Sequence, residues 1–338
     1  MNHRTLGRSG LKVSPLCLGT MNFGGPTDEA EALRIVGQAR DAGINFIDTA
    51  NVYTGGRSEE IVGRAIAGER DRWVVATKAN GVFGPGPNER GSSRKALMGA
   101  VAASLRRLGT DYIDVYYLHR EDAEVPLAES VRALGDMQRA GAIRYFALSN
   151  HKAWRLAEIC NLCDGLGIDR PVASQPYYNA MNRTLEIEHL PACAFYGLGA
   201  VPYSPLARGV LSAKYAPGAP PPADSRAGRQ DARMMQTEWR QESLEIAQVL
   251  KEHAARRGIT PGQFATAWVL ANQIVTSVIA GPRTQAQLAD YLGAVDVRLG
   301  PEDEALVDRL VAPGHNSTPG YSDPMERPEG RVMRPADG

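Results

Sequence analysis

Residues 43–60 read GINFIDTANVYTGGRSEE, an apolar run that ends at Asp48 and is followed five residues later by Tyr53 in a glycine-rich turn. A short apolar run bounded by a turn is typical of a buried strand. A carboxylate at the end of such a strand costs on the order of several kcal/mol in desolvation unless it is paired. The stretch therefore predicts that a cation from elsewhere in the chain lies beside Asp48.

Eight short apolar runs of this kind recur along the chain, separated in most cases by one longer amphipathic pattern. One such helical pattern, residues 127–141, ends at Gly141, a residue type favoured after a helix because it tolerates positive φ. Eight strand–helix units favour an α/β fold of the closed (β/α)8 TIM-barrel type over an open doubly wound sheet. The predicted strands cover residues 16–21, 44–50, 73–78, 112–119, 143–149, 172–175, 200–204 and 275–281.

Four further segments surround or interrupt these units. A turn signal at residues 7–10 predicts an N-terminal hairpin. The interval between the seventh and eighth runs is about twice the usual unit, and its proline-rich stretch 216–224 predicts a long loop. Residues 301–310 carry a helical pattern, and the proline- and glycine-rich tail 312–338 is expected to be irregular, either packed over the barrel mouth or mobile.

Composition limits the class of protein. A length of 338 residues admits two average domains or one barrel, and the repeat favours a single domain over residues 1–338 with its barrel at about 13–311. Hydrophobic residues make up 43% and charged residues 22%, and 38 cationic side chains balance 38 acidic ones. This balance argues against a nucleic-acid or membrane-surface partner. Because residues 1–15 do not resemble a signal peptide and no run approaches a membrane span, we expect a cytoplasmic protein.

Two features could indicate a metal or redox site, and both have simpler interpretations. Cys160 and Cys163 form a CxxC pair inside a helical pattern with no second ligand pair nearby, so two small buried residues are favoured over zinc or redox chemistry. A metal-dependent barrel hydrolase needs several acidic or histidine ligands at strand ends, and only Asp48 and His119 stand there. We therefore expect no metal.

Polar residues stand at the carboxyl ends of three neighbouring predicted strands. Asp48 ends the second predicted strand, Lys78 the third and His119 the fourth, while Tyr53 follows the second by one short turn. In a barrel of this type the active site lies at the carboxyl ends of the strands, so these four side chains are expected to project towards one rim. Lys78 then supplies the cation that Asp48 needs.

The chemistry of this group follows from its charges. A phenol titrates near pH ~10, and an adjacent ammonium favours its ionised form, so we expect Lys78 to lower the pKa of Tyr53. Asp48 keeps Lys78 charged, and His119 can donate a hydrogen bond to a carbonyl oxygen. The arrangement would polarise a C=O group for attack by hydride. The alternative is an incidental Asp–Lys pair with an unrelated core histidine.

Five motifs resemble those of the aldo-keto reductases: INFIDTANVY, VVATK, YYLHR, FALSN and YSPLARGVL, in this order on these strands. The resemblance extends from residue 3 to about 311, and GPGPNERG after the third strand is similar to the bacterial branch related to potassium-channel β-subunits. It implies a catalytic tetrad of Asp48, Tyr53, Lys78 and His119. It also implies reduction of an aldehyde or ketone, or the reverse oxidation, with NADPH as cofactor and Tyr53 as proton donor.

The cofactor cannot bind through a Rossmann fingerprint, because no GxGxxG follows a strand. Ser149, Asn150 and Gln175 end later strands and have side chains that could hold a carboxamide, and Tyr203 offers a ring face. Their alternative role is to cap the following helices. Cofactor contacts by resemblance are Gly19, Thr20, Met21, Asp48, Ser149, Asn150, Gln175, Tyr203, Ser204, Pro205, Leu206, Arg208, Gly209, Lys214, Gly281, Arg283, Gln287 and Tyr291.

Two groups among these residues suit phosphate. Residues 204–215 carry Arg208 and Lys214, which can bind a pyrophosphate. Arg283 stands at a predicted helix start, where a guanidinium and free backbone N–H groups make a phosphate site, and by resemblance it contacts the 2′-phosphate, which favours NADPH over NADH. Family members often have Asn where this chain has Tyr291, so this chain departs from the family pattern at the residue expected to contact the adenine.

The substrate is less well indicated. The rim should expose Met21, Phe23, Val82, Phe83 and Tyr177, an apolar lining suited to a non-polar carbonyl compound or a sugar face, with Tyr53 and His119 at the reacting group. Two classes of function remain, a carbonyl reductase and an NADP(H)-binding, redox-sensing regulatory subunit with little turnover. The tetrad favours the reductase. The residues leave open whether the barrel forms a homo-oligomer.

Overall fold

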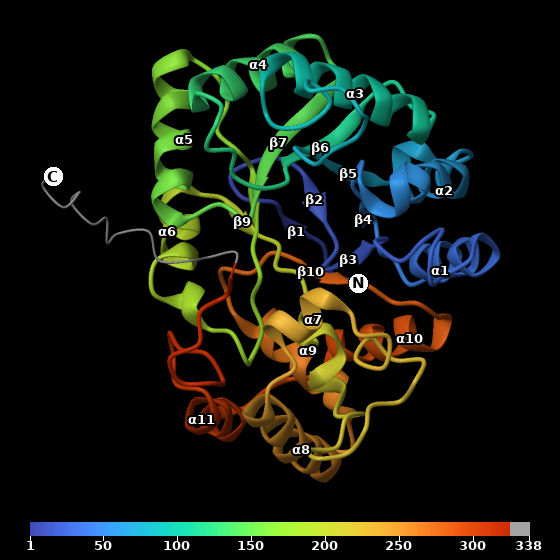
Figure 1. The fold of residues 1–338 in the computed structure, drawn as a ribbon, viewed down its shortest axis with the longest axis vertical. Helices are drawn as coiled ribbons and strands as arrows, with labels where there is room; N and C mark the ends of the chain where they lie inside the picture. The colour runs from blue at the N-terminus through green and yellow to red at the C-terminus, as the bar shows by residue number, and fades with distance from the viewer. Residues whose placement is uncertain (325–338) are drawn as a thin grey trace, which may run out of the picture.

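A closed barrel of eight parallel strands forms the centre of the molecule in the computed structural model, which describes residues 1–324 (Figure 1). The strand order in the sheet is β10-β3-β4-β5-β6-β7-β8-β9. Its two edges meet through a parallel bridge between Ala200 and Val275, supported by a 3.0 Å hydrogen bond from the Ile279 N–H to the Pro202 carbonyl. The strands are β3 (Leu16–Gly19), β4 (Phe46–Asp48), β5 (Val74–Ala79), β6 (Ile113–Leu118), β7 (Ile143–Ser149), β8 (Ala173–Gln175), β9 (Gly199–Ala200) and β10 (Val278–Ala280). The TIM-barrel prediction is confirmed.

An antiparallel hairpin precedes the barrel, as the turn signal predicts. It pairs β1 (Arg4–Thr5) with β2 (Lys12–Val13), and Leu6 in its turn is fully buried. Leu6 packs in one cluster with residues at the starts of strands, among them Phe46 and Val172. The hairpin therefore closes the amino-terminal end of the barrel and leaves the carboxyl end for a site.

Helices cover the outside of the barrel (Figure 1). The first, α1, shows why they form: the Asp28 side chain accepts a hydrogen bond from the Glu31 N–H at its start, and its apolar side chains recur at positions 32, 35, 36 and 39, which lie on one face. The helices are α1 (Glu29–Asp41), α2 (Arg57–Ile66), α3 (Arg94–Leu108), α4 (Leu127–Arg139), α5 (Ala153–Leu166), α6 (His189–Tyr196), α7 (Ala232–Thr237), α8 (Gln241–Arg256), α9 (Pro261–Ala271), α10 (Gln285–Gly293) and α11 (Pro301–Leu310).

The strands bury side chains on both faces, and their alternation decides which residues point inward. On β6, Val115 and Tyr117 join the cluster inside the barrel, whereas Tyr116 and Leu118 join the larger cluster between the strands and the helices. Ala76 likewise lies inside. Because side chains two apart on a strand share a face, Lys78 also points into the barrel, near the end of β5.

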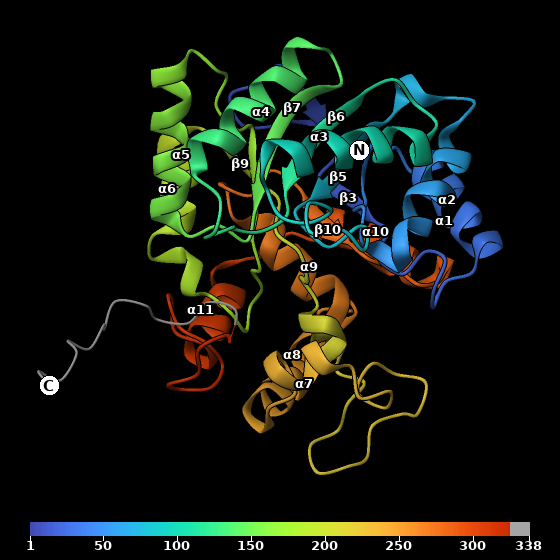
Figure 2. The ribbon, with the colours of Figure 1, turned by 45° about the horizontal axis from the view of Figure 1, so that its top comes forward.

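The segment between β9 and β10 contains more structure than a loop. After the proline-rich stretch it forms α7, α8 and α9, and Figure 2 shows the loop, α7 and α8 standing to one side of the barrel. The predicted helix 301–310 is present as α11. Residues 312–324 pack on the loop after β8, where the Ser317 N–H donates to the Met181 carbonyl at 2.9 Å; residues 325–338 of the predicted tail lie outside the described part.

Several strands are shorter than the predicted runs, β4 and β10 among them, and the run 200–204 differs most. Only Ala200 of this run lies in β9, and Tyr203 stands beyond the strand in an isolated bridge with Tyr177. Pro202 is the physical reason, because proline has no N–H to donate to a ladder. Tyr203 therefore lies in the loop after the strand, at the carboxyl end of the barrel.

Replacing Leu6 tests whether the hairpin is part of the barrel core. We expect Leu6→Ala to lower the free energy of unfolding by about 2–5 kcal/mol, since it leaves a cavity under the strand starts. Urea unfolding followed by circular dichroism measures this change. Leu33→Ala, at a side chain that is 41% exposed on α1, is the control and should cost much less. Equal midpoints for the two variants would show that the hairpin is not needed to close the barrel.

Candidate active site

Four side chains meet at the carboxyl ends of adjacent strands. The Lys78 ammonium donates to an Asp48 carboxylate oxygen, to the Thr49 carbonyl at 2.7 Å and to the Tyr53 hydroxyl at 3.2 Å. The rings of Tyr53 and His119 stand edge to face with centroids 5.9 Å apart. The predicted pairing of Lys78 with Asp48 is confirmed, and the two other polar side chains lie against the same pair.

The Lys78–Asp48 pair is shielded from water, with side-chain exposures of 0% and 3%. Burial disfavours the Lys78 ammonium, but the charge of Asp48 and the Tyr53 oxygen outweigh it, so the pKa of Lys78 lies above its ordinary value. Burial also raises the pKa of Asp48, against the opposing charge of Lys78. All three donors of Lys78 have acceptors, which is the condition under which a buried ammonium is tolerated.

The pKa of Tyr53 shifts in the direction opposite to the one that the sequence predicts. Burial raises the pKa of the Tyr53 hydroxyl above its ordinary value, and the charge of Lys78 reduces this rise without reversing it. The predicted effect of Lys78 is therefore present, but it is smaller than the cost of taking a phenolate out of water. The phenol stays protonated near neutral pH and can act as a proton donor.

His119 is neutral at physiological pH. Burial lowers its pKa to about 3, and the charges of Lys78 and Arg120 add to this effect. Its Nδ1 atom has no hydrogen-bond partner among residues 1–324. A neutral imidazole keeps one N–H donor and adds no positive charge beside Lys78.

A second row of polar residues continues the network from Asp48. The Gln175 amide donates to the other Asp48 oxygen at 2.9 Å, and the Ser149 hydroxyl donates to the Gln175 carbonyl at 3.0 Å. The Asn150 amide donates to the His119 carbonyl at 2.9 Å, and its oxygen accepts from the Tyr203 hydroxyl at 2.8 Å.

The capping alternative for this row does not hold. The residue at the start of α5 is Lys152, not Ser149 or Asn150, and no side chain caps that helix. Asn150 instead has a positive φ of 54° and bonds to the loop after β6. These side chains are therefore ordered around the tetrad rather than around a helix end.

A cavity of about 700 Å³ opens beside Tyr53 and His119, and all eighteen predicted cofactor residues line it. Lys78 lies behind the wall. Eight lining residues escaped the sequence analysis: Asn22, Ser212, Arg226, Asp231, Arg233, Ile279, Ala286 and Asp290. Ile279 carried a signal, because alternation on the last strand turns it inward. The others stand on loops or on helices, and no periodic pattern in the sequence indicates that these segments approach the cavity.

Three predicted substrate residues do not line this cavity, which corrects the prediction. Phe23 is fully buried in the core between strands and helices, and Phe83 packs against the outside of the same core. Tyr177 is only 5% exposed, because it donates to the Glu238 carboxylate and packs behind Tyr203 with ring centroids 5.7 Å apart. Val82 is exposed and outside the cavity. Large apolar side chains near a rim were thus drawn into the core.

Cations gather along one part of the cavity. Arg208 lies 3.8 Å from Glu238, and its Nε atom, which is shielded from solvent, has no hydrogen-bond partner among residues 1–324. Arg226, from the long loop, lies 3.9 Å from Asp231. Burial lowers the pKa of Arg226, and the charges of Arg208 and Arg283 add to this effect. Such weakly compensated guanidinium groups suit a polyanion.

Arg283 precedes α10, as predicted, and its N–H donates to the Gln287 side chain at 2.8 Å. The donor set as a whole fits an extended dinucleotide with phosphates, since amide and ring faces stand beside the tetrad and the cations Arg208, Lys214, Arg226 and Arg283 stand along the same cavity. Tyr291, the departure from the family pattern, is also in the wall and is 8% exposed.

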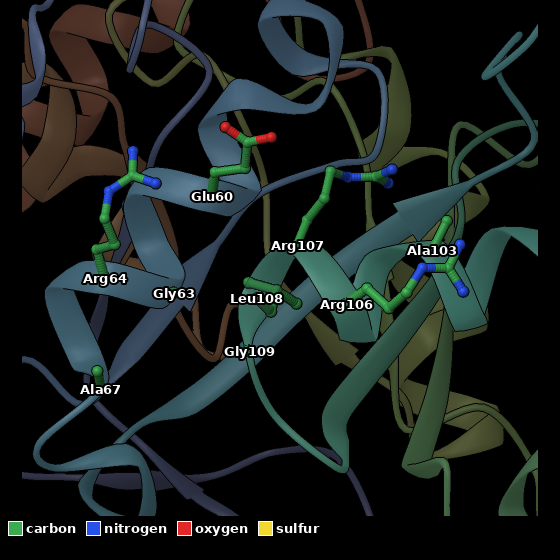
Figure 3. A pocket seen from close by; sticks show the side chains of 9 residues that line it. All are labelled: Glu60, Gly63, Arg64, Ala67, Ala103, Arg106, Arg107, Leu108 and Gly109. Atoms are coloured by element: carbon green, nitrogen blue, oxygen red, sulfur yellow. The ribbon is translucent and has the colours of Figure 1, made fainter.

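A second hollow, of about 440 Å³, lies on the outer surface between α2 and α3 (Figure 3). Glu60, Arg64 and Arg106 stand on its rim, and Figure 3 shows the guanidinium groups of the two arginines pointing away from each other. No residue of the tetrad reaches it.

Two searches of the described residues concern other classes of site. Cys160 and Cys163 are both buried on α5, and burial raises the pKa of each thiol, to about 11 and about 12. Among residues 1–324 no three His, Cys, Asp or Glu side chains are grouped as metal ligands would be. No described helix is long and apolar enough to span a bilayer.

Comparison with known proteins gives one family. A model described as the Aldo/keto reductase family matches residues 15–312. The chain is 39% identical to a protein named probable voltage-gated potassium channel subunit beta from Oryza sativa subsp. japonica, over 92% of this chain and 96% of that protein. It is 37% identical to the uncharacterized oxidoreductase YrpG of Bacillus subtilis, over 95% and 100%, and 33% identical to versiconal hemiacetal acetate reductase of Aspergillus parasiticus, over 93% and 99%.

The buried ion pair can be tested by unfolding alone. Lys78→Met leaves the Asp48 carboxylate buried without its cation, so we expect a loss of about 3–5 kcal/mol in the free energy of unfolding. Adding Asp48→Asn should recover part of that loss, because it removes the unpaired charge. Both are measured by urea denaturation.

The control is an exposed pair of the same type. Arg64→Met breaks the contact to Glu29, in which the arginine side chain is 49% exposed, and should cost no more than about 1 kcal/mol. If the double variant is as unstable as Lys78→Met, the cost does not come from the unpaired carboxylate.

Proposed function

The chain belongs to the aldo/keto reductase family of oxidoreductases, and on that premise we propose that it reduces an aldehyde or ketone to an alcohol with NADPH. The observation that carries the proposal is the Tyr53 hydroxyl, held 3.2 Å from the Lys78 ammonium on the wall of the cavity beside a neutral His119. A protonated donor beside a buried cation, at the wall of an open cavity, is the arrangement that general acid catalysis of carbonyl reduction needs.

Tyr53 is the proton donor in this mechanism. When a carbonyl oxygen gains negative charge, the phenol transfers its proton to that oxygen, and the nearby Lys78 charge stabilises the phenolate that remains. Asp48 holds Lys78 in place through a direct ion pair and is itself held by Gln175. In the reverse direction the phenolate accepts the proton of an alcohol.

His119 orients the substrate. Because its imidazole is neutral, it can donate one hydrogen bond to the carbonyl oxygen without adding a second positive charge beside Tyr53. The carbonyl oxygen then lies between a hydroxyl and an imidazole on the same wall. Two donors aimed at one oxygen polarise the C=O bond and fix the direction from which it can be attacked.

NADPH, when bound, supplies the hydride for the carbonyl carbon. Ser149, Asn150 and Gln175 present hydroxyl and amide groups that can hold a carboxamide, and the Tyr203 ring can cover a flat heterocycle beside them. These side chains are tied to Asp48 and His119 by the hydrogen bonds described above. Their order would fix the nicotinamide against the reacting carbon, as the hydride step requires.

The cations along the cavity support NADPH as the cofactor. Arg208 and Lys214 can neutralise a pyrophosphate, while Arg226 and Arg283 can hold a 2′-phosphate near the start of α10. Arg226 and Arg283 are close enough for the charge of one to influence the pKa of the other. Two neighbouring guanidinium groups repel each other unless an anion lies between them.

A regulatory subunit that binds NADP(H) and turns over little is the second candidate. It is favoured by the 39% identity to a protein named as a probable potassium channel subunit beta. A purely regulatory site needs the cofactor cations but has no need of a buried acid–base group. The tetrad around Tyr53 therefore supports the reductase more strongly.

Removal of the Tyr53 hydroxyl tests the proposal. We expect Tyr53→Phe to lower the reduction of aldehydes, followed by NADPH absorbance, by about 10²–10⁴-fold because the general acid is lost. NADPH affinity, measured by fluorescence quenching, should change little. Tyr145→Phe, at a partly buried tyrosine of β7 outside the cavity, is the matched control. A Tyr53→Phe enzyme as active as this control would mean that another group donates the proton, and an inactive natural chain that still binds NADPH would favour the regulatory subunit.

Cofactor choice provides the second test. A charge-assisted contact contributes on the order of 1.5–3 kcal/mol, so Arg283→Ala should weaken NADPH binding roughly 10- to 150-fold. NADH binding should change little, since NADH lacks the 2′-phosphate. Arg309→Ala, on the exposed face of α11, serves as the control for loss of an arginine. Equal losses for NADPH and NADH would show that Arg283 supports the loop and not the phosphate.

A further inference from the structure

Arg233 is a fifth cation in the cavity wall, and the cofactor sites leave it unassigned. It stands on α7, and its side chain is 22% exposed. One nitrogen, Nη2, lies 2.5 Å from the Asp323 carboxylate. The other, Nη1, is shielded from solvent and has no hydrogen-bond partner within residues 1–324. An unsatisfied guanidinium N–H at a cavity is costly and calls for an acceptor.

The groups around Arg233 differ from those around Arg226. Besides burial, the groups that influence the pKa of Arg226 are Arg208, Asp231, Tyr291 and Arg283, and Arg233 is not among them. The groups that raise the pKa of Arg233, against the effect of burial, are Asp323, Tyr203 and Tyr321. Arg233 lines the same cavity as Tyr203, whose hydroxyl is hydrogen-bonded to Asn150, and Asn150 in turn donates to the His119 carbonyl.

The charges around Arg233 restrict the kind of ligand that can bind beside it. Asp323 already engages one side of the guanidinium. Burial raises the pKa of Glu238, and the nearby charges of Arg208, 3.8 Å away, Arg240 and Arg233 oppose this rise. A phosphate dianion next to these two carboxylates would need more cations than Arg233 supplies, whereas a singly charged carboxylate needs only the free Nη1 side. Met21, Leu206 and Ile279 line the same cavity and offer apolar contact for a short carbon chain.

We infer that Arg233 binds a carboxylate on the carbonyl substrate, so that the preferred substrates are aldehydes or ketones that carry an acid group. The inference rests on the proposed function, because it assigns the substrate class of the same cavity. The carbonyl oxygen lies at Tyr53 and His119, and the acid group reaches Arg233. Asp323, from the segment after α11, keeps the guanidinium at the wall.

Matched aldehydes test the inference by steady-state kinetics. 4-Oxobutanoate is compared with butanal, and 4-formylbenzoate with 4-methylbenzaldehyde, so that each pair differs mainly in the carboxylate and two lengths are covered. A charge-assisted hydrogen bond predicts a preference in kcat/KM of roughly 10- to 150-fold for the acid of at least one pair, expressed mainly in KM. Arg233→Met should bring that ratio close to one, and Arg233→Lys should retain part of it. Lys251→Met, an exposed charge on α8, should leave the ratio as it is.

Direct binding separates this inference from the proposed reductase activity. 4-Hydroxybutanoate and 4-(hydroxymethyl)benzoate are titrated calorimetrically into the chain saturated with NADP⁺; at least one should bind, and Arg233→Met should weaken it about tenfold or more. If the chain reduces no aldehyde but this binding difference is present, the proposed activity fails and the carboxylate site stands. If the acids have no advantage in kinetics or binding, the inference is wrong.

Two further outcomes would also overturn the inference. An equal, large loss of NADPH affinity in Arg233→Met, measured by fluorescence quenching, would assign Arg233 to the dinucleotide. A larger preference for glyceraldehyde 3-phosphate over glyceraldehyde than for either carboxylate pair would assign it to phosphate. Thermal unfolding of the variants with and without NADP⁺ shows whether each is folded, and Arg233→Lys keeps the comparison informative if Arg233→Met is not.

Discussion

The ion pair between Lys78 and Asp48 is the constraint on which the site depends. Two charges inside a barrel are tolerated only when each remaining donor and acceptor is satisfied. Here the Thr49 carbonyl and the Tyr53 hydroxyl take the other two donors of Lys78, and Gln175 occupies the second Asp48 oxygen. Satisfying the pair therefore brings the phenol of one loop and the amide of a distant strand to the same point.

The barrel supplies the geometry that this pair needs. β4 and β5 are neighbours, Asp48 is in register with Ala76, and Lys78 is two residues further along on the same inward face. The hairpin around Leu6 closes the opposite end. The hairpin thereby keeps water from reaching the ion pair through the amino-terminal end of the barrel, while the carboxyl end stays open to the cavity.

The cavity then combines two environments. Near the tetrad, burial keeps His119 neutral and Tyr53 protonated. Elsewhere along the wall, guanidinium groups from the segment after β9 and the turn after β10 are only weakly compensated. The strands thus carry the tetrad side chains, apart from Tyr53 and His119 in the loops that follow them, and the segments after β9 and β10 carry the guanidinium groups.

Local pattern determined much of this arrangement. The eight apolar runs predict the barrel because alternation and helical period are properties of neighbouring residues, and the polar residue that ends each strand predicts Asp48, Lys78 and His119 at one rim. What needed the tertiary structure is how the loops close over that rim. Phe23 and Tyr177 were expected in the cavity but are buried, because apolar surface near a rim is stabilised by packing against whatever core lies within reach.

Arg226 and Arg233 carry no signal in the sequence, since an arginine after a proline-rich stretch is most simply a solvated charge. Only the path of the chain after β9 brings them to the cavity, and the contacts of Arg233 with Asp323 join positions ninety residues apart. The sequence by itself thus determined the fold and the residues of the tetrad, because both follow from short-range periodicity. The tertiary structure alone decided which side chains line the cavity at the mouth, because that depends on packing between distant segments.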